Sequence, residues 1–345
     1  MKNRKLTWII LIVAVLITSI IALFNFNKKN NNVIKLVIDD SAARYVLENI
    51  DRAQINKALI YKKYKGYQMQ IDWVNNKDNS KLKSVEESKF LCDYFEECYK
   101  NYKKDSNQVC QVLKIIDELH VLEKIKRDKI SQHLLSYLPS KSGFTTNLYL
   151  VVFTPINGTA RNNNIMVRLD SKNSAEYTLN LMIHEAYHIG QGRNYYFYLR
   201  LYSTINKKKR FMMQMYHDMQ FEGLATWVGF KALDFMPITY TEDYNLPGYD
   251  YFQLEKDTCV RNSIKQINRL IAKTNCSAID SLNKEAFDIG VWKRAYYVAG
   301  AYMSKIIEAK FGKEHLAGLI NKNEKVFIKE YNALVSDDYK IAVIE

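Results

Sequence analysis

The sequence predicts an α+β fold that is mainly helical, with a small β-sheet ahead of one central helix and a membrane-spanning segment at the N-terminus. Three observations lead to this prediction. The chain of 345 residues has only 4 prolines and 12 glycines, which favours long uninterrupted helices. A β-branched and aromatic stretch at 147–170 interrupts the helical spacing of apolar residues. Residues 7–24 form an apolar run without any charge.

The apolar run at 7–24 predicts a signal-anchor. A helix of this length rises about 27 Å, which is enough to cross the hydrocarbon core of a bilayer. Basic residues stand in the segment 1–6, so we expect that segment in the cytoplasm and the rest of the chain outside, in a single-pass membrane protein. Residues 25–32 are expected to form a linker. Secretion after cleavage of a signal peptide is the alternative.

The remainder, 33–345, is predicted to be a single unit with a helical N-terminal part at 33–140 and a second part at 141–345. Residues 33–39 resemble a strand, and a helix is expected to begin at Ser41. The stretch 80–136 has helical spacing, and we expect two helices there that are separated near Asn107.

The second part is predicted to begin with a β-hairpin of strands 147–154 and 165–170, with Asn157-Gly158 in its turn. Strand 165–170 is then the edge on which an extended peptide would lie. The next helix is expected to be capped by Asn173, with Glu176 completing a capping box, and to end at Gly190 and Gly192. Later helices are predicted at 211–234, 252–273, 293–311 and 325–334.

The predicted central helix contains the sequence HEAYH, residues 184–188. Histidines four apart lie one turn above the other on a helix, so His184 and His188 can reach one metal ion. Glu185 is rotated by about 100° from His184, which leaves its carboxylate free to hold a water. Two neutral imidazoles beside an unligated carboxylate suit a catalytic zinc site.

A catalytic zinc usually takes three protein ligands, so a third is needed. His217, Glu222 and His315 are the candidates in the chain that follows. Glu222 lies among small and apolar residues on its predicted helix, where a carboxylate is costly to bury unless it is paired or binds a metal. His217 is rotated away from that face, and Gly223 permits another backbone to approach. Glu222 is therefore the expected third ligand.

The net charge of +13 does not predict a nucleic-acid partner, because the basic residues are spread along the chain. A basic exterior suits an anionic cell-envelope surface. The five cysteines contain no CxxC pair, which argues against a thiolate zinc site. Cys259 and Cys276 are a candidate disulfide, although the sequence does not assign the pairing.

HEAYH at 184–188 followed by EGLATW at 222–227 resembles the gluzincin zinc metallopeptidases. More closely, residues 33–320 resemble predicted bacterial Zn-dependent peptidases filed as domains of unknown function. The resemblance implies a zincin-like catalytic domain with one zinc ion per chain. It implies His184, His188 and Glu222 as the metal ligands and Glu185 as the general base.

The same resemblance implies a Tyr-x-x-Gly pattern on a late helix, which Tyr297 and Gly300 fit. Tyr297 is then a candidate donor to the oxyanion. Relatives place an aspartate one turn after the ligand glutamate to orient a zinc histidine. Here that position is Thr226, with Asp218 one turn before Glu222, so either residue is a candidate for this supporting role.

The sequence therefore predicts a membrane-anchored or secreted zinc metallopeptidase that acts on peptides or proteins. Two alternatives remain at this stage. A metal-binding or surface interaction protein without catalysis would keep the ligands but lack turnover. A membrane-anchored binding protein without metal would make the motif coincidental.

Overall fold

The structure is a computed structural model, and it describes most of the chain after the predicted linker. The described ranges are 33–51, 55–78, 82–139, 143–195, 206–240, 242–243, 248–274 and 279–343. Within these ranges no helix has both the length and the apolar character needed to cross a membrane. The predicted signal-anchor at 7–24 and its flanks 1–6 and 25–32 lie outside them.

Four strands of the described residues form one sheet in the order β1-β2-β4-β3. The strands are β1 (Lys35–Asp39), β2 (Thr145–Val151), β3 (Gly158–Arg161) and β4 (Asn164–Arg168). β1 pairs with β2 in parallel, β2 pairs with β4 in parallel, and only β3 runs antiparallel to its neighbour β4. The sheet therefore unites a strand from the beginning of the described chain with three from its middle.

The predicted hairpin exists, but its strands and its turn were placed wrongly. β2 and β4 are parallel partners, whereas the hairpin joins β3 to β4 through Asn162 and Asn163. Both asparagines have positive φ, 50° and 59°, as a tight two-residue hairpin turn requires. Gly158 begins β3 instead of forming the turn. Because β4 lies between β2 and β3, the strand at this edge of the sheet is β3, not the predicted strand at 165–170, and β1 forms the other edge.

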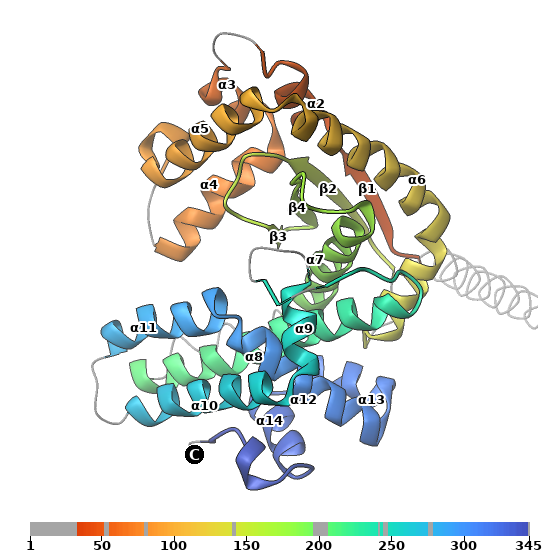
Figure 1. Cartoon of the computed structure of the whole chain (residues 1–345). Helices are drawn as coiled ribbons and strands as arrows, with labels where there is room; N and C mark the ends of the chain where they lie inside the picture. The colour runs from red at the N-terminus through yellow and green to blue at the C-terminus, as the bar shows by residue number, and fades with distance from the viewer. Residues whose placement is uncertain are drawn as a thin grey trace, which may run out of the picture.

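The N-terminal helices pack around the sheet, as Figure 1 shows, with α6 running along the molecule beside β1. α4 lies on one face of the sheet, where a Cβ on Gly66 would meet the side chains of Tyr149, Val151 and Met166. The two helices expected at 80–136 are present and are separated at Asp105, whose side chain caps the second. These helices are α2 (Ser41–Glu48), α3 (Lys57–Lys63), α4 (Lys65–Asp78), α5 (Lys89–Lys104) and α6 (Ser106–Ser136).

The central helix α7 (Ala175–Tyr195) follows the sheet and packs against β3 and β4. Its cap is Ser174, whose Oγ accepts a hydrogen bond of 3.1 Å from the N–H of Tyr177, so the prediction of Asn173 was off by one residue. Gly190 and Gly192 do not end the helix. Gly190 instead lets Leu138 pack closely, because a Cβ there would lie 2.5 Å from the Leu138 side chain.

The remaining helices form a second group below α7 in Figure 1, with α8 (Lys207–Lys231) and α12 (Ala295–Phe311) packed against each other. Gly223 and Gly300 meet where these two helices cross, and a Cβ on Gly223 would lie 2.3 Å from the Gly300 backbone. The close approach expected at Gly223 is thus present. The other helices are α9 (Tyr249–Glu255), α10 (Asp257–Lys273), α11 (Ile279–Phe287), α13 (Lys313–Gly318) and α14 (Glu324–Asn332).

The described chain is mainly helical with a small sheet, which confirms the predicted fold class at that level. Cys92, Cys98, Cys110 and Cys259 are free thiols. Cys276, the candidate partner of Cys259, lies outside the described residues.

Candidate metal centre and active site

The two histidines of the motif lie one turn apart on α7 and point in the same direction. Their Nε2 atoms are 3.0 Å apart, and both side chains are buried. Burial lowers the pKa of His184, which favours the neutral imidazole that a metal needs. The helical spacing predicted from the sequence is therefore realised in the positions of the ring nitrogens.

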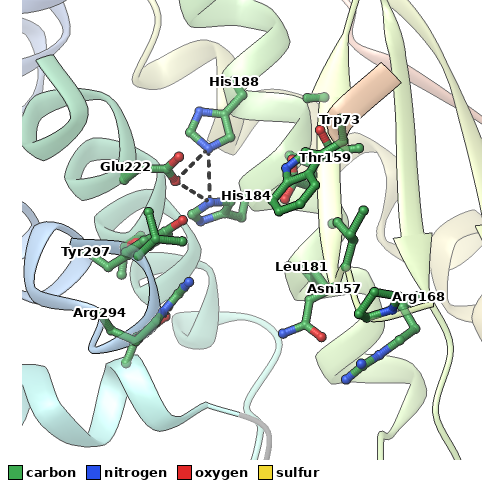
Figure 2. A pocket seen from close by; sticks show the side chains of 18 of the residues that line it. Trp73, Asn157, Thr159, Arg168, Leu181, His184, His188, Glu222, Arg294 and Tyr297 are labelled. Carbon is green, nitrogen blue, oxygen red and sulfur yellow. Dashed lines mark hydrogen bonds and ion pairs between the residues drawn. The ribbon is translucent and has the colours of Figure 1, made fainter. Parts of the chain in front are cut away.

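Glu222 reaches the same point from α8. Its Oε2 lies 3.2 Å from His188 Nε2 and 3.4 Å from His184 Nε2 (Figure 2). Burial favours the neutral acid, but the adjacent His188 and His184 outweigh it and hold the pKa of Glu222 well below its usual range. The carboxylate is therefore ionised, as a metal ligand must be.

These three residues fit a zinc ion. One ligand atom from each lies within 4.8 Å of the others. Zinc bound to nitrogen or oxygen at 2.0–2.1 Å in a tetrahedral arrangement has its ligand atoms about 3.3–3.4 Å apart, close to the distances observed between these nitrogens and the carboxylate oxygen. Two imidazoles and one carboxylate are also the donor set of one established type of catalytic zinc site.

The tautomer of His188 follows from Gln191, a residue that the sequence analysis did not single out. The Gln191 amide donates a hydrogen bond of 3.1 Å to the carbonyl of Phe221, so its Oε1 must be the atom 2.8 Å from His188 Nδ1. Nδ1 therefore carries a proton, and Nε2 is the ring nitrogen that faces the cluster and would bind a metal. The sequence feature that could have identified Gln191 is its position three residues after His188, the second histidine of the motif.

Asp218 and Thr226, the two predicted candidates for this supporting role, both line the cleft. Asp218 accepts a hydrogen bond from Gln214. The hydroxyl of Thr226 is buried without a hydrogen-bond partner among the described residues. Among the described residues outside the ligand set, Gln191 is the one whose side chain accepts a hydrogen bond from a motif histidine.

Glu185 lies beside the cluster without belonging to it. Its side chain is buried, and burial raises the pKa of Glu185 to about 7. Such a carboxylate can take and return a proton near neutral pH. Gly158 of β3 leaves the space for it, because a Cβ on Gly158 would lie 2.4 Å from Glu185 Oε1. The edge strand and the predicted general base are thus in direct contact.

Tyr297 lies on α12, next to His184. Its ring is stacked on His184, with centroids 6.2 Å apart and an angle of 17° between the planes. The Arg294 guanidinium also covers the Tyr297 ring, at 3.3 Å from its centroid, and two nitrogens of Arg294 bind the Asp250 carboxylate at 2.5–3.1 Å. The sequence analysis names Tyr297 as a candidate but not Arg294, which has a left-handed backbone (φ 62°) immediately before α12.

The close crossing of α8 and α12 explains why Tyr297 is near Glu222. A Cβ on Gly300 would lie 2.0 Å from the carbonyl oxygen of Met219, so only glycine permits the approach. Tyr297 is one turn before Gly300, and Glu222 is beside Gly223. The Tyr-x-x-Gly spacing is therefore explained by packing: Gly300 permits the close crossing of the helices, and Tyr297, one turn before it, is thereby brought near Glu222.

The cluster opens into a cleft of about 840 Å³. Figure 2 shows Glu222, Tyr297 and Arg294 on one side, and Trp73, Thr159 and Arg168 on the other. The two other ligand candidates lie elsewhere: His217 is 3.7 Å from the Glu324 carboxylate, and His315 is 2.5 Å from Glu330.

Residues 44–339 match the profile of the family described as "Putative zinc dependent peptidase (DUF5700)". The chain belongs to this family. The match confirms the resemblance to zinc-dependent peptidases of a domain-of-unknown-function family. Comparison with curated proteins and with solved structures finds no match.

Proposed function

We propose that this protein hydrolyses peptide bonds with one zinc ion per chain, held by His184, His188 and Glu222, and with Glu185 as the general base. The observation that carries the proposal is the convergence of the three ligand atoms beside a buried, unligated carboxylate at the wall of a cleft. The family description supports zinc dependence and peptide hydrolysis.

Zinc, when bound, polarises a carbonyl and lowers the pKa of a water toward about 7. The chain supplies the proton transfers. Glu185 takes a proton from the attacking water, and its raised pKa allows it to return that proton to the nitrogen of the leaving amine. Gln191 holds the ring of His188 in the orientation that the cluster needs.

Tyr297 is the proposed donor to the oxyanion. Its ring contacts both His184 and the Arg294 guanidinium, which limits the freedom of the phenol to turn away. Asp250 keeps Arg294 in place through a bidentate ion pair. The proposed substrate is an extended peptide that pairs with the edge strand β3, whose residues 158–161 line the cleft.

The proposed location is the outer side of a membrane, with the chain anchored by residues 7–24. The uncharged run and the basic residues before it support this proposal. Fusion of a reporter to the C-terminus, with protease protection measured in intact cells, tests it. A reporter that remains protected contradicts the proposed orientation.

Metal analysis and hydrolysis of a peptide library test the proposed function. We expect about one zinc per chain and cleavage that a chelator abolishes. Glu185→Gln should keep zinc and lower hydrolysis by about 100-fold or more, because it removes the base but leaves the ligands. Zinc binding without any cleavage by the wild type would favour a non-catalytic metal-binding protein. Absence of zinc would contradict the ligand assignment.

A further inference from the structure

The edge strand β3 divides the cleft into two sides. Residues opposite each other in paired strands have their side chains on the same face of a sheet, and Thr159 is opposite Met166. Met166 is on the face covered by α4, since its Cγ lies 3.7 Å from where a Cβ on Gly66 would be. Gly158 is on the other face, against Glu185. Thr159 therefore faces α4, away from the proposed base.

Two helices on the face of Thr159 present apolar side chains to the cleft. α4 contributes Met69 and Trp73, which are four residues apart and so lie on one side of the helix. α5 contributes Phe90, a large apolar side chain that is 50% exposed. We call Met69, Trp73 and Phe90 the apolar wall. Figure 2 shows Trp73 on the same side of the cleft as Thr159, across from Glu222.

The helix α5 is fixed to this face of the sheet. The Tyr94 hydroxyl, one turn after Phe90, accepts a hydrogen bond of 3.0 Å from Arg168, which also donates to the carbonyl of Thr154 at 3.2 Å. Arg168 is at the end of β4. The apolar wall is therefore held at a defined position relative to the edge strand β3. A subsite that binds one substrate side chain selectively needs such a fixed position.

A peptide paired with β3 directs alternate side chains to the two faces of the sheet. Gly158 lies against Glu185, the proposed base. Thr159 is the next residue of β3 and is therefore one position along the strand from that base. The substrate side chain opposite Thr159 then points toward α4. An exposed apolar surface in a cleft is typical of a binding site for an apolar group.

We propose that the apolar wall is a specificity subsite that binds one large apolar side chain of the peptide, near the bond that is cleaved. This inference rests on the proposed function and deepens it, because it names the class of substrate: peptides with an aromatic or large aliphatic residue beside the cleavage site. Smaller or charged side chains leave the surface of Trp73 and Phe90 in water and bind less well.

Peptide binding to full-length, zinc-loaded protein that carries Glu185→Gln tests the subsite without turnover. The probes are capped octapeptides of alanine and glycine with a single phenylalanine at each position in turn. We expect phenylalanine at one position to lower the Kd by about tenfold or more relative to alanine. Trp73→Ala and Phe90→Ala should each reduce this preference to about threefold or less, and Trp73→Phe should retain most of it.

Phe311→Ala is the matched control, since Phe311 is 46% exposed, similar to Phe90, but lies at the end of α12 and does not line the cleft. It should keep the full preference. The subsite is refuted if phenylalanine helps at no position, or if its advantage survives both wall substitutions. Zinc content and hydrolysis by the wild type are measured separately, so a failure of the proposed function is distinguishable from a failure of the subsite.

Discussion

The helix α8 carries two histidine–carboxylate clusters, and they differ in what they can do. Glu222 meets His184 and His188 at the wall of the cleft. One and a half turns earlier, His217 meets Glu324 of α14, whose side chain is fully buried. The ring of Phe221 separates the two clusters, since it stacks on His188 at 4.2 Å and contacts His217 at 5.2 Å.

The difference shows that residue type alone does not make a metal site. In the first cluster three ligand atoms converge on one point, and a second carboxylate remains free to accept a proton. In the second cluster one imidazole faces one carboxylate, and burial lowers the pKa of His217 to about 4, so the ring is neutral at physiological pH. We expect the first cluster to serve catalysis and the second to stabilise the packing of α8 on α14.

The largest effect should come from Glu222→Ala. Loss of the third ligand is expected to abolish stable zinc binding and to lower hydrolysis by about 1000-fold or more, because several kcal/mol of transition-state stabilisation are lost with the metal. Zinc per chain after gel filtration and cleavage of a fluorogenic peptide measure this. If zinc stays bound with unchanged affinity, Glu222 is not a ligand and the first cluster resembles the second.

Gln191→Leu should weaken zinc binding by about 10–100-fold, because the Nδ1 proton of His188 then lacks its acceptor. Competition with a chelator of known affinity measures the change. Gln191→Glu keeps an acceptor for His188 Nδ1 but loses the donor to the Phe221 carbonyl, so it should recover only part of the affinity. Unchanged zinc affinity in Gln191→Leu would contradict a role of this hydrogen bond in holding His188.

Gly158→Ala should lower kcat by about tenfold while zinc binding stays normal, because the added Cβ would displace the Glu185 carboxylate. Steady-state kinetics and metal analysis together measure this. Gly192→Ala on α7 is the control, since a Cβ there meets no described residue within 4 Å. A normal kcat for Gly158→Ala would argue against Glu185 as a base held at this place.

The smallest effect on activity should come from His217→Leu. We expect hydrolysis and zinc content to remain within about threefold of the wild type, because His217 is separated from the ligands by Phe221. The free energy of unfolding should fall by about 1–3 kcal/mol, since the buried Glu324 loses a polar neighbour. Chemical denaturation measures it. Loss of zinc in this variant would contradict the separation of the two clusters.

The features predicted correctly from the sequence depend on neighbours along the chain. His184, Glu185 and His188 lie on one helix, so the period of that helix alone places two rings together and the carboxylate beside them. Glu222 is predicted as the third ligand because a carboxylate among small and apolar residues needs a partner, and it lies against those rings in the structure. The approach at Gly223 was likewise expected from the residue itself.

Strand pairing was predicted wrongly because it is a contact between distant segments. The residues of β2 and β4 have the composition of a hairpin. In the structure, however, β2 pairs in parallel with β1 along one edge and with β4 along the other, and β1 lies more than a hundred residues earlier in the chain. This arrangement makes β3 the edge strand and places Gly158 against Glu185. Nothing within β3 itself indicates that position.

The sequence by itself determined the helix that carries His184 and His188, the mainly helical character and the candidate third ligand, because helical periodicity and the cost of burying a carboxylate act locally. Only the tertiary structure decided which groups support that helix. The carbonyl of Phe221 orients Gln191 and thereby His188, and the crossing of α8 with α12 brings Tyr297 and Arg294 to the cleft. These contacts join segments that share no periodic pattern, so their geometry exists only in the folded chain.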